Sequence, residues 1–314
     1  MNAELLIMFT LNCDRAYLYA HPERELTAEE ISRYDEAIAR RATGLPAQYI
    51  TGHQEFWGMD LIVSPAVLIP RPETEHVVET VLDIVARHGQ GWDRGEQQAP
   101  PAGASHPITP EAGALGTPAP APHGLRIVDV GTGSGAIALA LAKELPAAEI
   151  HATDLSTEAL EVAEANAARH EFSSRIQFHF ADLLSPFLNA RQSQSEGSSA
   201  GAPGGGAFDF VVSNPPYVGE SEEDQVQLEV RKFEPRKAVF AGTTGLEVIG
   251  RLIPQAGEAL RPGGWLVFEI SGTIADGVRR LLVAWDEVEI TNDLQGIPRV
   301  ARARKPKGLS SRTK

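Results

Sequence analysis

The sequence predicts an α/β fold: a mostly parallel sheet covered by helices on both faces, preceded by a small helical domain. Two observations predict it. From about residue 126, short apolar runs alternate with segments of helical period, which is typical of parallel strands joined by helices. The first fifty residues instead carry helical patterns. A hydrophobic share of 42% in 314 residues is sufficient for one large core and a second small one.

The first segment, residues 1–48, is expected to form the helical domain. Thr27-Ala28-Glu29-Glu30 has the form of a capping box, in which Thr27 caps a helix and the Glu30 side chain reaches back to it. Gly44 and Pro46 end that helix. The apolar run 5–9 lacks a basic flank and a small-residue cleavage site, so we interpret it as the core face of an earlier helix rather than a signal peptide.

Residues 49–70 are expected to form a β-hairpin that links the domains, because apolar runs there alternate with turn residues. A helix from Pro72 to Arg87 follows, since proline is favoured in a first helical turn. The large domain is expected to span residues 71–304. Its expected strands are 126–130, 149–153, 176–180, 208–213, 265–270, 288–291 and 299–303. Its expected later helices are 135–145, 156–170, 246–260 and 275–285.

Two stretches of the large domain lack periodicity. Residues 89–124 are rich in Pro, Gly and Ala, and residues 189–206 are rich in Ser and Gly. Such compositions cannot bury enough apolar surface to fold, so we interpret both as disordered insertions. The end of the chain, residues 305–314, is expected to be a solvated basic tail.

The composition limits the classes of function. A formal net charge of −14 argues against broad binding to nucleic-acid backbones, which needs clustered Lys and Arg, so we expect no stable nucleic-acid partner. The single cysteine, Cys13, excludes an intrachain disulfide, and the nine histidines show no ligand spacing, so a metal-free protein is predicted. No run is long enough to span a bilayer. We expect a cytoplasmic protein that does not bind membranes.

The most informative motif is Asn214-Pro215-Pro216-Tyr217, which follows the apolar run 208–212. A buried strand ending there would place the motif at the carboxyl edge of the sheet, where ligands bind in open α/β sheets. The Asn214 side-chain oxygen and the Pro215 carbonyl could each accept one N–H of a planar NH2 group, and the prolines would fix the backbone. Tyr217 could lie against that group. The alternative is an ordinary loop, because N-P and P-P are turn dipeptides.

A glycine-rich loop, Gly131-Thr132-Gly133-Ser134-Gly135, lies between the first large-domain strand and its helix. Glycines let the backbone approach a ligand, and a helix N-terminus offers free N–H groups. The spacing lacks the third glycine of a dinucleotide fingerprint, and Ala136-Ile137 stands where a phosphate-binding loop has Lys-Ser/Thr. Asp129, just before the glycines, suits a cationic amine and a sulfonium better than a pyrophosphate.

Two further carboxylates follow strands of the same sheet. Asp154 could accept both hydroxyls of a ribose, with a helix N-cap as the alternative. Asp182 could face an adenine amino group or occupy an ordinary turn. Together with the glycine loop these residues favour S-adenosylmethionine over NAD. A sulfonium methyl donor beside a motif that binds NH2 groups predicts an N-methyltransferase.

The chain resembles a known family, the HemK/PrmC release-factor glutamine methyltransferases, over nearly its whole length. The matching segments are 48–58 (QYITGHQEFWG), 68–75 (LIPRPETE), 129–135 (DVGTGSG), 213–217 (SNPPY), 233–235 (FEP) and 296–300 (GIPRV). The combination of the second and fourth segments is more specific than either alone.

The resemblance implies a Rossmann-like class I S-adenosylmethionine-dependent methyltransferase domain with a seven-stranded sheet, behind a helical domain that helps to dock a protein substrate. It also implies methylation of N5 of the glutamine in the Gly-Gly-Gln motif of class 1 peptide chain release factors. We expect a monomer. The expected donor-binding residues are Asp129, Gly131, Thr132, Gly133, Ser134, Gly135, Asp154, Asp182, Leu183 and Asn214. The expected glutamine-binding and catalytic residues are Asn214, Pro215, Pro216 and Tyr217, with Arg71 and Glu73 close by or simply capping the helix that follows.

The sequence departs from the family pattern in its N-terminal domain, which is shorter than usual, and in its two insertions. Leu183 stands at a position that is often aromatic in the family, so weaker stacking on the adenine is expected. Two alternatives remain. One is a related N-methyltransferase that acts on a ribosomal-protein glutamine or a nucleic-acid adenine. The other is a donor-binding protein without catalytic activity.

Overall fold

The computed structural model describes residues 2–88, 124–188 and 208–307. Its central feature is a seven-stranded sheet with the order β5-β4-β3-β6-β7-β9-β8. The strands are β3 (Arg126–Val130), β4 (Glu149–Asp154), β5 (Ile176–Phe180), β6 (Phe208–Ser213), β7 (Leu260–Glu269), β8 (Asp286–Asn292) and β9 (Pro298–Arg304). Strands β3 to β7 are parallel to one another, whereas β9 runs antiparallel to β7 and to β8. The predicted mostly parallel sheet is confirmed.

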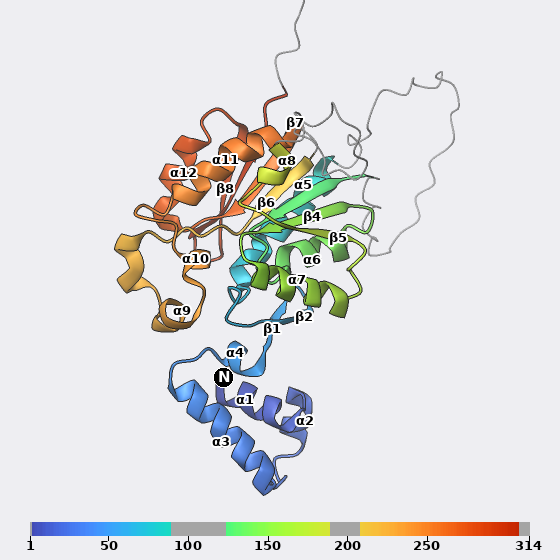
Figure 1. The fold of residues 1–314 in the computed structure, drawn as a ribbon, viewed down its shortest axis with the longest axis vertical. Coiled ribbons are helices and arrows are strands. Elements are labelled where there is room, and N and C mark those ends of the chain that lie inside the picture. Colours follow the sequence, from blue (N-terminus) through green and yellow to red (C-terminus); the bar gives the residue numbers. More distant parts are fainter. Residues whose placement is uncertain (1, 89–123, 189–207, 308–314) are drawn as a thin grey trace, which may run out of the picture.

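Helices cover both faces of this sheet (Figure 1). The helices α5 (Glu75–His88) and α6 (Ala136–Glu144) lie in one core, to which α7 (Thr157–Arg169) also contributes. The helices α8 (Ser185–Leu188), α11 (Glu247–Ala259) and α12 (Ala275–Leu281) lie in the other. Side chains of β7 alternate between the two cores, with Val267 in the first and Leu266 and Phe268 in the second. This period of two is what a strand buried on both faces requires.

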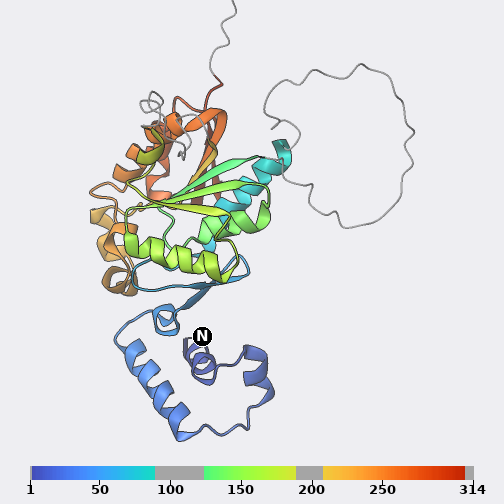
Figure 2. The ribbon, with the colours of Figure 1, turned by 45° about the vertical axis from the view of Figure 1, so that its right-hand side comes forward.

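The small helical domain lies apart from the sheet in both ribbon views (Figures 1 and 2). It contains α1 (Asn2–Leu11), α2 (Arg15–Ala20), α3 (Ala28–Ala42) and α4 (Ala47–Thr51). The predicted capping box of α3 is confirmed, because Thr27 Oγ1 accepts from Glu30 N at 3.2 Å and Glu30 Oε2 accepts from Thr27 N at 2.9 Å.

The short helix α4 connects two hydrophobic clusters. Ile50 packs with Leu6 and Ala37 in the core of the helical domain. The preceding residue, Tyr49, packs in a second cluster with Val67, and its hydroxyl donates to the Val67 carbonyl at 2.6 Å. The adjacent residues Tyr49 and Ile50 of one helix therefore pack in two different clusters, and only that of Ile50 is the core of the helical domain.

The linking hairpin consists of β1 (His53–Phe56) and β2 (Met59–Ile62), which pair antiparallel. Its turn residues Trp57 and Gly58 have φ of 53° and 66°, as a type I′ turn requires. The hairpin packs Phe56, Met59 and Leu61 into the first core, and the buried side chain of Asn166 in α7 also holds it to the large domain. The Asn166 side chain accepts from Ile62 N at 2.7 Å and donates to the carbonyls of Ile62 and Ser134, both at 2.9 Å.

Several elements differ from the sequence prediction. The hairpin strands occupy only 53–62, because α4 takes the start of the expected segment. The expected helix at 72–87 begins with a 3-10 turn, η1 (Pro72–Thr74). Strand β7 begins at Leu260, earlier than expected. Residues 219–240, for which no element was predicted, contain η3 (Glu220–Gln225), α9 (Leu228–Phe233) and α10 (Arg236–Val239).

The two predicted insertions lie almost entirely outside the described residues, as does most of the predicted basic tail. Within the described parts of the chain, no helix is both long enough and apolar enough to cross a membrane.

Candidate functional site

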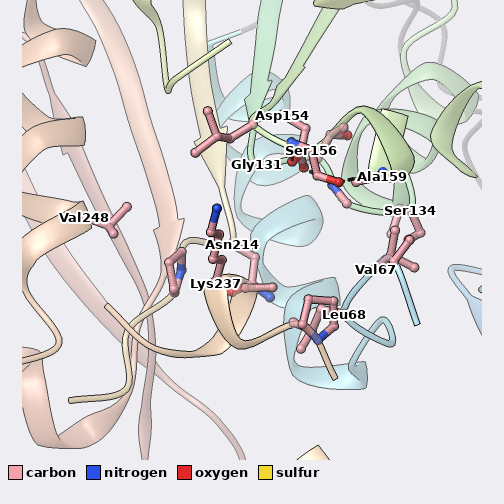
Figure 3. Close-up of a pocket in the computed structure, with 18 of the residues that line it drawn as sticks. Val67, Leu68, Gly131, Ser134, Asp154, Ser156, Ala159, Asn214, Lys237 and Val248 are labelled. Atoms are coloured by element: carbon pink, nitrogen blue, oxygen red, sulfur yellow. Dashed lines mark hydrogen bonds between the residues drawn. The ribbon is translucent and has the colours of Figure 1, made fainter. Parts of the chain in front are cut away.

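A cavity of about 510 Å³ opens at the carboxyl ends of β3, β4 and β6. Figure 3 labels several of the residues that surround it, among them Gly131, Asp154, Asn214 and Val248. The cavity lies beside β3, from which the chain continues to β4 on one side and later to β6 on the other. Such switch points are where open α/β sheets bind ligands. Most of the predicted donor-binding residues line it: Gly131, Thr132, Gly133, Ser134, Asp154, Asp182, Leu183 and Asn214.

The glycine loop is shaped by backbone conformations that favour glycine. Gly131, Gly133 and Gly135 have φ of 72°, 56° and 83°. A Cβ atom at Gly131 or Gly133 would meet nothing within 4 Å, so the loop leaves open space there. At Gly135 a Cβ would lie 3.3 Å from that of Ala163, so glycine permits α7 to pack closely. The helix α6 begins directly after this loop, with Gly135 as its N-cap residue.

Asp154 ends β4, and its carboxylate lines the cavity. One oxygen accepts from Gly133 N and the other from Ser156 N, each at 2.9 Å. The N-cap of α7 is Ser156, whose hydroxyl accepts from Ala159 N, and not Asp154. Each carboxylate oxygen can accept a second hydrogen bond, so Asp154 retains acceptor sites for ligand hydroxyls.

The next residues along this rim are Asp182 and Leu183. Asp182 forms an ion pair with Arg251 of α11, and all three side chains line the cavity. Leu183 has φ of 53°, a left-handed conformation that is uncommon for leucine. Arg251 was not predicted, because nothing in the sequence connects it with residues near position 182.

Asp129 differs from the expectation, because its side chain does not line the cavity. It is buried beneath the loop, where it accepts from Thr132 Oγ1 at 2.7 Å. Burial raises the pKa of Asp129 to about 7, although the hydrogen bond from Thr132 opposes the shift. Asp129 therefore supports the glycine loop from beneath.

A second cavity, of about 490 Å³, adjoins the first. Its polar lining includes the predicted residues Arg71, Glu73 and Tyr217 and also Glu269 and Arg299, which were not predicted. Four residues line both cavities: Leu68, Asn214, Pro216 and Ala238. Asn214 therefore lies where the two cavities meet. Pro215 is buried and lines neither of them.

The Asn214 side chain is held by a chain of hydrogen bonds. Asn214 Nδ2 donates to Thr74 Oγ1 at 2.9 Å, and Thr74 Oγ1 donates to Glu269 Oε2 at 2.6 Å. The other Glu269 oxygen accepts from Tyr217 Oη at 2.9 Å. Burial raises the pKa of Glu269, and the bonds from Thr74 and Tyr217 oppose this shift. Neither Thr74 nor Glu269 was predicted.

The phenol of Tyr217 is a hydrogen-bond donor in this arrangement. Burial raises its pKa well above the ordinary value, and the neighbouring Glu269 carboxylate raises it further. Tyr217 therefore stays neutral at ordinary pH and does not act as a proton acceptor.

Arg71 is the N-cap residue of η1, but its side chain makes no capping bond. Its guanidinium instead pairs with the buried carboxylate of Glu234, which also accepts from Ile69 N at 3.1 Å. The Arg71 side chain therefore does not cap the helix, which was the alternative role. Glu73 lines the second cavity.

Comparison with known proteins identifies the family. A model described as the PrmC N-terminal domain matches residues 1–52, and a methyltransferase domain model matches residues 122–269. The release factor glutamine methyltransferase of Koribacter versatilis is 49% identical over 98% of this chain and 91% of that protein. The chain belongs to the release factor glutamine methyltransferase family. The enzyme of that name from Chlorobaculum tepidum is 37% identical over 95% of this chain and 88% of that protein.

A solved structure shares the fold of this family member. The catalytic domain of hMettl16, in complex with a MAT2A 3'UTR hairpin, superposes with a TM-score of 0.51 at 15% identity, covering 88% of this chain and 82% of that one. The predicted class I methyltransferase architecture, with a seven-stranded sheet behind a small helical part, is confirmed.

The donor of a methyltransferase of this family is S-adenosylmethionine. The first cavity fits it chemically. The open space at Gly131 and Gly133 admits a ligand against the backbone, and the Asp154 carboxylate can accept hydroxyl donors. Among the described residues, no three His, Cys, Asp or Glu side chains are grouped so as to hold a metal ion.

Proposed function

We propose that this protein transfers a methyl group from S-adenosylmethionine to N5 of the glutamine in the Gly-Gly-Gln motif of class 1 peptide chain release factors. One observation carries the proposal: Asn214 lies between a cavity that fits the donor and a second, polar cavity. Its Nδ2 is engaged by Thr74, which leaves Oδ1 to accept a hydrogen bond. The names of the relatives support a release factor as the substrate.

The acceptor nitrogen needs positioning more than a strong base. When bound, S-adenosylmethionine supplies an electrophilic methyl carbon on a sulfonium. An amide nitrogen is a weak nucleophile, because its lone pair is delocalised into the carbonyl. Asn214 Oδ1 would accept one N–H of the glutamine, which directs the lone pair toward the donor cavity. The Pro215 carbonyl, expected from the sequence to accept the other N–H, is not part of this proposal because Pro215 lines neither cavity. Positioning of this kind supplies several kcal/mol of a barrier.

The second cavity would hold the glutamine and the backbone next to it. Tyr217 would lie against the planar amide, held in place by its bond to Glu269. Arg71, Glu73 and Arg299 offer charges of both signs for peptide carbonyls and N–H groups. Because Tyr217 remains protonated, the proton lost by the amide nitrogen would pass to water after transfer.

The helical domain would dock the body of the release factor, in the cytoplasm where translation factors act. Five large apolar side chains of this domain are exposed, with accessible fractions of 48% for Phe9, 40% for Tyr17, 70% for Tyr19, 46% for Ile31 and 38% for Ile38. Exposed apolar side chains of this size suit contact with a protein partner.

The test is methyl incorporation from labelled S-adenosylmethionine into a purified class 1 release factor, beside a variant whose motif glutamine is replaced by alanine. Label in the unchanged factor alone is the expected result. Label in both would place the methyl group on another residue. Donor binding by calorimetry without label in either factor would assign the enzyme a different acceptor.

A further inference from the structure

Glu269 lies at the end of β7 and touches neither the donor cavity nor the Asn214 side chain directly. We propose that Glu269 is a positioning residue which, through Thr74, sets the direction in which the Asn214 amide faces the two cavities. This inference rests on the proposed function, because it concerns the atom of Asn214 that receives the glutamine N–H.

The direction of each hydrogen bond follows from the chemistry of Glu269. Both of its oxygens accept, Oε2 from the Thr74 hydroxyl and Oε1 from the Tyr217 hydroxyl, which is the arrangement of an ionised carboxylate. The Thr74 hydroxyl has one proton, which lies in its bond to Glu269 Oε2. Its oxygen can then only accept from Asn214, and the group that approaches it must be Nδ2. Oδ1 is thereby turned away from Thr74, free for an N–H donor.

The opposite orientation of Asn214 would oppose the reaction. With Oδ1 toward Thr74, the two Nδ2 hydrogens would face the glutamine NH2. Both groups are hydrogen-bond donors, so no hydrogen bond could form between them. The two amide orientations have almost the same shape, so packing alone distinguishes them poorly. The hydrogen bonds from Asn214 through Thr74 to Glu269 select one of the two orientations, which the shape of the amide does not.

The three residues are fixed by separate elements, which makes the network rigid. Thr74 ends the η1 turn, and Glu269 ends β7 next to the end of β6, where Ser213 pairs with Phe268. Thr74 and Glu269 are buried, with accessible fractions of 4% and 1%. Tyr217 occupies the second Glu269 oxygen, so the carboxylate cannot turn freely.

Thr74→Val tests the proposal, because valine keeps the shape of threonine and removes the relay. Thr74→Ser restores the hydroxyl. The matched control is Ser213→Ala, which removes another buried hydroxyl bond, to the Val130 carbonyl at 2.7 Å, beside Asn214. Each variant is assayed for kcat and KM with the full-length release factor, for donor affinity by calorimetry and for melting temperature.

We expect kcat of Thr74→Val to fall at least tenfold with donor affinity within twofold of wild type, and Thr74→Ser and Ser213→Ala to keep most of kcat. In Glu269→Gln combined with Thr74→Val, the loss should equal that of Thr74→Val alone, because both changes break one relay. Unchanged kcat in Thr74→Val, an equal loss in Ser213→Ala, or additive losses in the double variant would overturn the assignment. A wild-type enzyme that does not methylate the release factor would overturn the proposed function itself, and this inference with it.

Discussion

The guanidinium of Arg71 pairs with the carboxylate of Glu234, although 163 residues separate them in the chain. The Glu234 side chain is almost fully buried, and it also accepts from the backbone of Ile69. This one carboxylate therefore joins the segment that leads into α5 to the segment between α9 and α10. The two segments border the cavities in which donor and acceptor are proposed to meet.

Replacement of Glu234 should destabilise the fold. Glu234→Ala leaves the Arg71 charge and the Ile69 N–H without their partner. Breaking a buried pair costs about 3–5 kcal/mol, and because the Arg71 side chain is one-third exposed we expect about 2 kcal/mol. Chemical denaturation measures it. The control, Glu223→Ala, breaks the exposed pair with Arg236 and should leave the denaturation midpoint unchanged.

Asn214→Ala should abolish turnover and leave the fold intact, because it removes the proposed acceptor for the glutamine N–H. Loss of one preorganised hydrogen-bonding group in an active site lowers kcat by roughly 100- to 1000-fold. Single-turnover methylation of the release factor measures this loss. Methylation at the wild-type rate would remove Asn214 from the mechanism.

Asp154→Ala should weaken donor binding, since it removes the carboxylate proposed to accept two ribose hydroxyls. Hydrogen bonds to charged groups contribute about 1.5–3 kcal/mol each, so the Kd should rise by roughly 100-fold or more. Asp182→Ala serves as the comparison. Its carboxylate is already engaged by Arg251 at a partly exposed site, and a smaller effect is expected. Calorimetry that finds equal effects would give Asp182 a direct role.

Asp129 should make stability depend on pH. Its pKa is about 7 in the folded protein and about 4 when unfolded. The folded state therefore binds more protons between these values, and stability falls as pH rises from about 4 to about 7. Asp129→Asn removes this loss and should be the more stable protein above pH 7, by roughly 4 kcal/mol at most. Urea titrations at pH 5 and pH 8 compare the two; an advantage for the variant that does not grow with pH would contradict the assignment.

The parts of the site that could be predicted from the sequence are those whose functional residues directly follow a strand that the sequence also predicts. The glycine loop and Asn214 each follow an apolar strand, and both line the first cavity. Thr74 and Glu269 could not be found in this way, since the bond between them joins positions 195 residues apart. Glu269 also lies in an apolar strand, where an isolated carboxylate has no local pattern to reveal its partners.

The missed secondary structure has a similar cause. The helices α4, α9 and α10 are four to six residues long, which is too short for a helical period to appear. The placement of Asp129 was misjudged for a different reason. Its position before the glycines indicated contact with a ligand, whereas the Thr132 hydroxyl that follows it folds back onto the carboxylate.

The helix α4 gives the two domains a fixed geometry. Since Tyr49 and Ile50 are anchored in different cores, the helical domain cannot swivel about this point without exposing apolar surface on one side. In the proposed reaction, a release factor gripped by that domain would reach Asn214 at a preset distance and angle. The enzyme would then select its substrate by length: only a glutamine on a loop that projects far enough from the docked release factor would reach Asn214.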